Sequence, residues 1–146
     1  MEVAAAMEIL TEESDEVEIY SEPILCKEKA EELLALINLP KGLLPLKDLE
    51  EVGYNKTKGF VWLKMRNKIE HKFRAIGRKV SYDTEITAFV EDGRLRRLTG
   101  IKAKELMIWV PVHDIFINKQ DPGKITFSNI TGLSRTFKVS AFESED

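Results

Sequence analysis

Residues that carry chemistry are scarce in this chain of 146 amino acids. Its one cysteine, Cys26, excludes an internal disulfide and favours a reducing compartment. The two histidines, His71 and His113, are not spaced with that cysteine as zinc ligands are. No apolar run approaches the roughly 18 residues of a membrane span. We therefore expect no metal site, no cofactor and no transmembrane segment.

The first residues also lack the basic end and the long apolar stretch of a secretory signal. A cytoplasmic location is the resulting expectation, with peripheral contact to a membrane left open. Cys26 falls where a helix is expected to begin, a position that can lower the pKa of a thiol. An inert packing role is the more common one for a lone cysteine and is favoured here.

Catalytic motifs are absent as well. Residues 132–136 lack the second glycine of the nucleophile elbow of hydrolases, and residues 77–81 do not form a phosphate-binding loop. His71 lies on the apolar face of its predicted strand, which favours a packing role. We assign no catalytic residue and expect a non-enzymatic protein. The alternative, a weak hydrolase, would have only four residues to use: Ser81, Ser134, His71 and His113.

Charge is divided unevenly along the chain, although the formal net charge is only −3. Residues 1–51 contain 4 basic and 14 acidic residues, a net charge of −10. Residues 52–104 contain 14 basic and 5 acidic residues, a net charge of +9, and residues 105–146 carry −2. Such segregation produces a local field even when the total charge is small.

The chain divides into an acidic leader over residues 1–22, a single domain over residues 23–142 and an acidic tail over residues 143–146. We predict a flexible leader in which Val17, Ile19 and Tyr20 dock as a short strand. Its acidic residues offer an alternative role, which is to fold over the basic middle of the chain and cover it.

One helix is predicted from about Ile24 to Ile37, because Ala30, Leu33, Leu34 and Ile37 recur at helical spacing. Pro40 ends the helix. The segment that follows, residues 39–45, combines leucines with two prolines and a glycine. It is expected to plug one end of the core.

Short apolar segments follow and predict antiparallel strands. Asp92-Gly93 favours a type I′ hairpin turn. One helix followed by regularly spaced strands indicates a mainly β (α+β) fold, an antiparallel β-sandwich or partly closed barrel of roughly eight or nine short strands. The predicted strands cover residues 60–65, 69–77, 82–90, 106–112, 115–117, 125–127 and 137–139.

The basic middle holds the candidate ligand-binding residues. If their side chains share one face of the sheet, they form a positive patch suited to an anionic lipid or amphiphile. Nucleic acid is disfavoured, because exposed aromatic residues are not interleaved with them. The alternative is that Asp83 and Glu85 neutralise Lys72 or Arg74 across a hairpin. The candidates are Lys64, Arg66, Lys72, Arg74, Arg78, Arg94, Arg96 and Arg97.

Aromatic residues are expected mainly in the core. Trp62 and Trp109 lie in or beside apolar segments, where core packing is the usual role. The alternative is that both tryptophans surround a cavity for an apolar ligand. Four phenylalanines would share that cavity: Phe60, Phe73, Phe89 and Phe127.

Several short motifs occur together along most of the chain. They are Leu39-Pro40-x-Gly42-Leu43-Leu44-Pro45, Gly59-Phe60, Tyr82-x-x-x-Ile86, Gly93-x-Leu95-x-x-Leu98-x-Gly100-Ile101, Trp109-x-x-Val112, Ile125-x-Phe127, and Phe137 with Phe142. This pattern, from about Glu31 to Phe142, resembles the plant domain-of-unknown-function family 538. The resemblance implies a plant protein with a β-sandwich beside a helix.

The resemblance also brings two functional suggestions, neither tied to a motif. One is similarity to lipid-binding bactericidal permeability-increasing proteins. The other is binding or hydrolysis of chlorophyll, with a link to stress responses. Many members begin with a secretion signal, whereas this chain begins with the acidic leader, so an extracellular role is not expected.

Three functional hypotheses follow. The favoured one is a non-enzymatic binding domain that engages an anionic or amphiphilic, lipid-like ligand through a basic β-face. The second is a protein-interaction module in which the acidic leader and the basic face meet a protein partner. The third is a weak hydrolase, or a binder, of chlorophyll-like esters.

Overall fold

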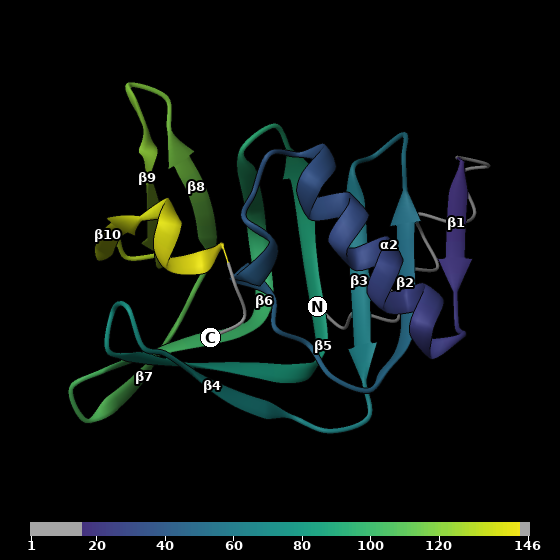
Figure 1. Ribbon diagram of the computed structural model, residues 1–146, viewed down its shortest axis with the longest axis horizontal. Helices are drawn as coiled ribbons and strands as arrows, with labels where there is room; N and C mark the ends of the chain where they lie inside the picture. The colour runs from purple at the N-terminus through teal and green to yellow at the C-terminus, as the bar shows by residue number, and fades with distance from the viewer. Residues whose placement is uncertain (1–15, 144–146) are drawn as a thin grey trace.

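The computed structural model describes residues 16–143, which form a ten-stranded antiparallel sheet and one α-helix near the N-terminal end (Figure 1). The predictions for residues 1–15 of the leader and 144–146 of the tail lie outside the described residues. The strands are β1 (Val17–Tyr20), β2 (Leu49–Asn55), β3 (Phe60–Met65), β4 (Ile69–Phe73), β5 (Arg78–Glu91), β6 (Arg94–Glu105), β7 (Ile108–Pro111), β8 (Asp114–Asn118), β9 (Asp121–Ser128) and β10 (Ser134–Lys138).

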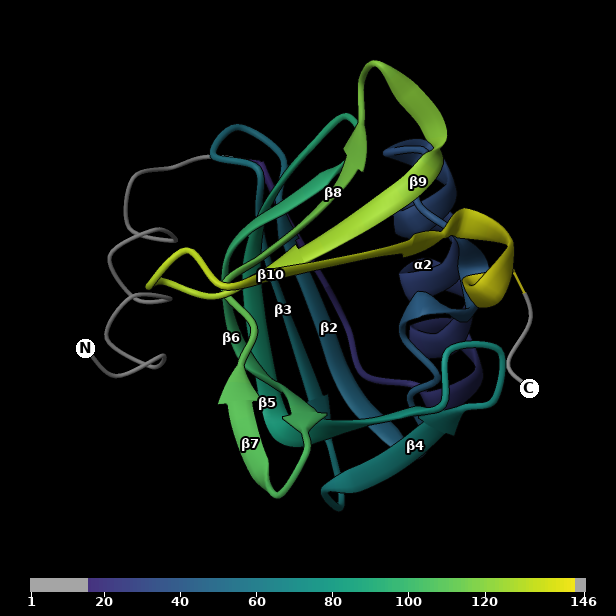
Figure 2. The same cartoon turned by 90° about the vertical axis from the view of Figure 1, so that its left-hand side faces the viewer.

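One continuous sheet accounts for all ten strands. Its order is β1-β2-β3-β5-β6-β8-β9-β10, with β4 added to β5 and β7 added to β6. The sheet is strongly curved but not closed (Figure 2). The predicted mainly β fold with one N-terminal helix is therefore confirmed, as are the short strand in the leader and the hairpin at Asp92-Gly93, where Glu91 pairs with Arg94. The predicted type I′ geometry of that turn was wrong, because φ is positive at Gly93 but not at Asp92.

The helix α2 (Pro23–Leu36) lies across one face of the sheet (Figure 1). Its first turn is capped by Glu22, whose carboxylate accepts hydrogen bonds from two backbone N–H groups at 2.8 and 3.2 Å. Pro23 suits this first turn, where no backbone N–H is required. The helix buries Cys26, Ala30 and Leu34 against the sheet. The predicted helix is confirmed to within one residue at each end.

Two short 3-10 helices fill the remaining gaps in the core. The first, η1 (Lys41–Leu43), buries Leu43, whose carbonyl accepts a hydrogen bond of 2.8 Å from the hydroxyl of Tyr82. This confirms the predicted plug. The second, η2 (Val139–Phe142), inserts Phe142 between the rings of Phe73 and Phe127, with centroid distances of 4.9 and 5.4 Å.

The two longest strands bend, and the bend divides the sheet. Pairing between β5 and β6 shifts register between Tyr82 and Thr87. Gly100 has φ +85° there, and a Cβ atom at this position would lie 2.2 Å from the carbonyl oxygen of Glu85. Beyond the bend, residues 78–82 of β5 and 101–105 of β6 form a four-stranded unit with β4 and β7. We call this unit the hairpin lobe; it lies at the bottom of Figure 1.

Two strands of this lobe were predicted with the wrong bounds. The strand predicted over residues 69–77 ends at Phe73, and residues 74–77 turn into β5. The strand predicted over residues 106–112 begins at Ile108, because Leu106 and Met107 form a two-residue turn after β6. Neither turn carries the Asn-Gly or Asp-Gly pair typical of hairpins, and the turn at Leu106-Met107 consists of apolar residues that a strand would also accept.

Candidate ligand-binding site

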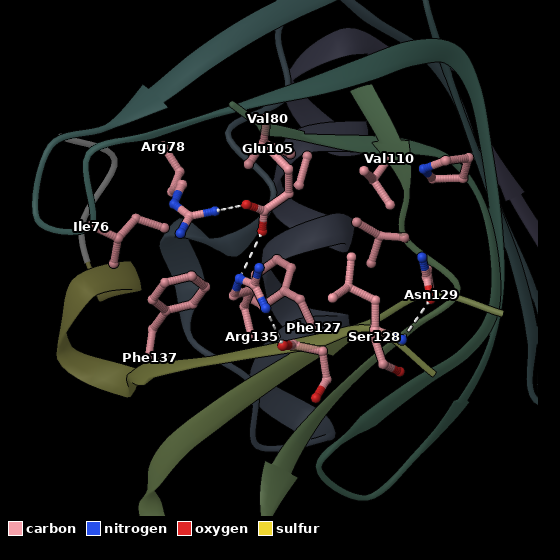
Figure 3. A pocket seen from close by; sticks show the side chains of 15 residues that line it. Ile76, Arg78, Val80, Glu105, Val110, Phe127, Ser128, Asn129, Arg135 and Phe137 are labelled. Atoms are coloured by element: carbon pink, nitrogen blue, oxygen red, sulfur yellow. Dashed lines mark hydrogen bonds and ion pairs between the residues drawn. The ribbon is translucent and has the colours of Figure 1, made fainter. Parts of the chain in front are cut away.

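An apolar cavity lies between the hairpin lobe and the β9–β10 hairpin (Figure 3). Its volume is about 40 Å³, enough for a few water-sized groups or the end of an aliphatic chain and far below the roughly 300 Å³ of a drug-sized pocket. The curvature of the sheet creates the cavity by bringing β10 opposite β5 and β6. Its apolar lining comes from Ile76, Val80, Ala103, Val110, Val112, Phe127, Leu133 and Phe137.

Three charged side chains lie on the rim of this cavity. The carboxylate of Glu105 makes ion pairs with the guanidinium groups of Arg78 and Arg135, the latter at 3.0 Å (Figure 3). Glu105 is 16% exposed, whereas Arg78 and Arg135 are 31% and 44% exposed. Arg78 also lies over the ring of Phe137, 5.9 Å from its centroid. One carboxylate therefore fixes two guanidinium groups at the edge of an apolar cavity, and the group retains a charge of +1.

The loop between β9 and β10 forms the opposite rim. The side-chain oxygen of Asn129 accepts hydrogen bonds from the backbone N–H groups of Thr131 and Leu133, at 3.1 and 2.9 Å, and from the Thr131 hydroxyl at 2.8 Å. These bonds hold Leu133 in the cavity wall. The side chain of Asn129 therefore fixes the conformation of the loop that forms this rim.

The predicted basic residues do not form one patch. Lys64 pairs with Glu51, and Arg66 pairs with Glu50, where β2 begins and β3 ends. Arg94 pairs with Asp114 at 3.2 Å, on the far side of the bend. Three of the predicted residues, Lys72, Arg74 and Arg78, belong to the hairpin lobe or its turn. Of these three, only Arg78 lines the cavity.

Arg96 and Arg97 form a separate group on the sheet face opposite the helix. Arg96 pairs with Glu91 at 3.5 Å. Both guanidinium groups lie over the ring of Phe89, at 5.5 and 5.8 Å from its centroid. Both guanidinium groups are therefore held against other residues of the protein.

The proposed neutralisation of Lys72 or Arg74 by Asp83 and Glu85 was wrong. The register between β4 and β5 places Lys79, another cation, opposite Lys72. Glu85 lies beyond the bend and faces Lys64 on β3. Asp83 and Glu85 are close to Lys72 and Arg74 along the chain. The turn at residues 74–77 nevertheless pairs β4 with residues 78–82 of β5, so neither acid lies opposite either cation.

The aromatic residues do not surround one cavity. Phe60, Trp62 and Phe89 pack together on the sheet face opposite the helix, with centroid distances of 5.0 and 6.0 Å. Phe73 lies in the core, and Phe127 alone of the six predicted residues lines the cavity. Trp109, expected in the core, is half-buried outside it, with the Lys104 ammonium 5.6 Å from its ring centroid.

The serines and histidines are not arranged as a nucleophile and its base. On β4 and β5, His71 pairs with Val80, so its side chain shares a face with Val80, whereas Ser81 points to the other face. His113 and Ser134 are both paired to Ser128, which puts strand β9 between them. Between residues 16 and 143, no hydrogen bond joins the Ser134 and His113 side chains.

Cys26 fits the inert role. Burial raises the pKa of its thiol, which donates a hydrogen bond of 3.2 Å to the carbonyl of Tyr20. Desolvation is the largest influence on this thiol, and it disfavours the charged thiolate. Within the described range, no group of three or more metal-ligating side chains occurs. No helix of that range is long and apolar enough to cross a membrane.

A wider groove of about 320 Å³ lies between α2 and the strands β1 and β2. Its charges are balanced, because Lys56 pairs with Glu18 at 3.0 Å and Lys29 pairs with Glu32 at 3.1 Å. Hydrogen bonds from the Tyr20 hydroxyl and from Lys56 lower the pKa of Glu18. The groove therefore offers no excess charge to a charged ligand.

A protein-family model described as "Protein of unknown function, DUF538" matches residues 30–143. The chain belongs to this family. The match confirms the resemblance carried by the motifs between Glu31 and Phe142, and its description assigns no activity. No curated protein and no solved structure gives a significant match.

Two members of the rim were missed by sequence reasoning. Glu105 and Arg135 both lie outside the basic middle, and 29 residues separate them. Of the two, only the position of Glu105 could have been predicted, from the pairing of neighbouring strands. Extending the antiparallel pairing of β5 and β6 from the Val80–Ala103 pair places Glu105 beside Arg78. Nothing in the local sequence of Arg135 indicates that the sheet curves back to this point.

Proposed function

We propose that this DUF538 domain binds an anionic amphiphile, such as an alkyl carboxylate or an alkyl phosphate. The head group lies against Arg78 and Arg135, and the end of the chain enters the apolar cavity beside them. The observation that carries the proposal is the positioning of two arginines, by one carboxylate, at the mouth of an apolar cavity. Arginine suits such head groups because its planar fork can donate two hydrogen bonds to one carboxylate or phosphate.

The expected affinity is modest. Each methylene group removed from water contributes about 0.8 kcal/mol, and a charge-assisted hydrogen bond contributes about 1.5–3 kcal/mol. The cost of association offsets part of this sum. A chain end of a few carbon atoms should therefore bind with a dissociation constant on the order of 1 mM. A macrocycle such as chlorophyll does not fit a cavity of about 40 Å³, so the small cavity favours a narrow aliphatic chain.

A chain-length series tests the proposal. Butanoate, pentanoate, hexanoate and octanoate are titrated into the ¹⁵N-labelled protein, and backbone amide shifts are followed by NMR. Affinity should rise roughly fourfold per methylene for the shorter chains and then level off when the cavity is full. Hexylammonium has the same chain and the opposite charge, and it should not compete.

Two variants complete this test. Arg135→Gln removes one head-group contact and should weaken hexanoate binding about fivefold, which corresponds to a loss of about 1 kcal/mol. Arg66→Gln removes an equal charge from a side chain that is 72% exposed and far from the cavity, and it should leave binding unchanged. Equal binding of hexanoate and hexylammonium, or equal loss in both variants, would overturn the proposed function.

A further inference from the structure

The turn between β6 and β7 exposes three large apolar side chains in a row. Leu106, Met107 and Ile108 are 94%, 89% and 63% exposed. Leu106 has φ +54°, a backbone conformation that favours glycine and is unusual for a bulky residue. A glycine and a polar residue would make the same turn more stable and more soluble. The turn therefore presents apolar side chains where folding alone does not require them.

A group of lysines lies beside this turn, on the face of the hairpin lobe that points away from the core. Lys72 on β4 is directly opposite Lys79 on β5, an arrangement that destabilises a sheet. Lys102 and Lys104 follow on β6, two residues apart and so on one face. In the described part of the chain, none of the four makes an ion pair. We call these four residues the lysine face.

Two further residues extend the same surface. Arg74 is exposed in the turn between β4 and β5, which lies at the same end of the lobe as the Leu106 turn (Figure 1). Trp109 is opposite Lys104 in the pairing of β6 with β7 and is half-buried beneath its ammonium group. Tryptophan is the residue most suited to the boundary between water and lipid, because its ring is apolar and its N–H is polar.

We propose that the hairpin lobe docks on an anionic membrane surface. Leu106, Met107 and Ile108 insert into the boundary between head groups and acyl chains, and the lysine face meets the negatively charged head groups. Charge complementarity supports this occupant, since four lysines without an ion pair and one acid, Glu70, lie on one face beside an apolar tip, and each basic residue near an anionic leaflet strengthens attachment. A protein partner without negative charge would meet the exposed apolar tip equally well, but it would not explain why unpaired lysines line the face beside it.

This inference goes beyond the amphiphile-binding proposal and does not depend on it. The two surfaces are nevertheless adjacent, because Glu105 at the cavity rim immediately precedes Leu106. Docking by the turn would bring the rim of the cavity to the membrane surface. Failure of one proposal can be told from failure of the other, because the hexanoate titration measures binding to the cavity and vesicle flotation measures docking of the hairpin lobe.

Vesicle flotation with the full chain tests the docking. One set of vesicles contains phosphatidylcholine only, and the other contains phosphatidylcholine with about one third phosphatidylserine, which supplies the anionic surface. We expect the protein to float with the anionic vesicles at low salt and to be released at high salt, because exposed charges are screened over about 10 Å at 0.1 M. Neutral vesicles should retain much less protein.

Two variants identify the surface. Leu106→Gly with Met107→Ser removes the apolar tip and relieves the positive-φ conformation, so it should fold at least as stably as the parent while binding anionic vesicles roughly tenfold less. Lys72→Gln with Lys79→Gln should reduce binding roughly 25-fold, since each lysine contributes about a fivefold gain near an anionic surface. These variants leave the arginines of the cavity rim in place.

Matched controls exclude general effects. Ile24→Ser with Leu36→Ser removes two apolar side chains of 71% and 69% exposure from α2. Lys119→Gln with Lys124→Gln removes the same charge from the β8–β9 hairpin. Both controls should float like the parent. Absence of binding to anionic vesicles, or binding that survives the loss of the apolar tip, would overturn the proposal, and the tip would then be assigned to contact with a protein.

Discussion

Glu105→Gln separates the two roles that a carboxylate between two arginines can have. If the amphiphile head group binds the same guanidinium groups, Glu105 competes with it. The substitution keeps the size and shape of the side chain and removes its charge. The charge of the three-residue rim then rises from +1 to +2, while Arg78 and Arg135 remain in place.

The expected magnitudes follow from the exposure of these groups. Two unit charges about 4 Å apart interact by about 4 kcal/mol near a protein surface, but Arg135 is 44% exposed, so solvent screening reduces the effect to about 1 kcal/mol. Hexanoate binding should therefore tighten about fivefold. The free energy of unfolding should fall by about 1–2 kcal/mol, because Glu105 is only 16% exposed and both arginines lose their anionic partner.

The signature is this combination of weaker folding and tighter binding. Urea unfolding gives the first quantity and NMR titration of hexanoate gives the second. Glu91→Gln is the matched control: it neutralises a 51% exposed acid paired with Arg96, away from the cavity, and should change neither quantity appreciably. Weaker hexanoate binding by Glu105→Gln would refute the reasoning, since it would mean that the carboxylate only positions the arginines.

Three further predictions concern the fold. Gly53→Ala would place a Cβ atom 1.9 Å from the buried indole of Trp62, so the free energy of unfolding should fall by about 2–3 kcal/mol in guanidinium denaturation; no loss would contradict the packing. Tyr82→Phe leaves a buried carbonyl without its donor and should cost about 1–2 kcal/mol near pH 7. Burial raises the pKa of Tyr82 above its ordinary value of 10.0, so the parent loses this stability as the pH rises past 10.0 and the deficit of the variant should shrink, whereas a constant deficit would argue against burial of the hydroxyl. Cys26, whose thiol pKa is raised by burial, should react with a thiol reagent far more slowly in native than in urea-unfolded protein; equal rates would disprove its burial.

Local signals were sufficient for most of the secondary structure. The helical repeat of Ala30, Leu33 and Leu34 together with Pro40 located the helix, and Asp92-Gly93 located the central hairpin. These signals act over a few residues, so tertiary structure does not change them. The turn at Leu106 could not be found in this way, because a leucine in a positive-φ turn contradicts the usual preference for glycine.

The candidate site depended on longer-range geometry. Arg78 was identified from its place in the basic middle, but its partner Glu105 became visible only through the register of β5 and β6. Arg135 required the curvature of the whole sheet, which follows from the bend at Gly100 and from the order of the strands. Charge counting along the chain therefore found a basic segment, whereas the fold holds five of the eight candidate residues in separate ion pairs.

The most direct test of the central claim is to locate a bound ligand. Intermolecular nuclear Overhauser effects can be measured between the terminal methyl group of hexanoate and the aromatic protons of the protein. Binding as proposed predicts cross-peaks to Phe127 and Phe137, which line the cavity behind Arg78 and Arg135. Cross-peaks to the rings of Tyr20 and Tyr54 in the groove beside α2, without any to the two phenylalanines, would contradict it.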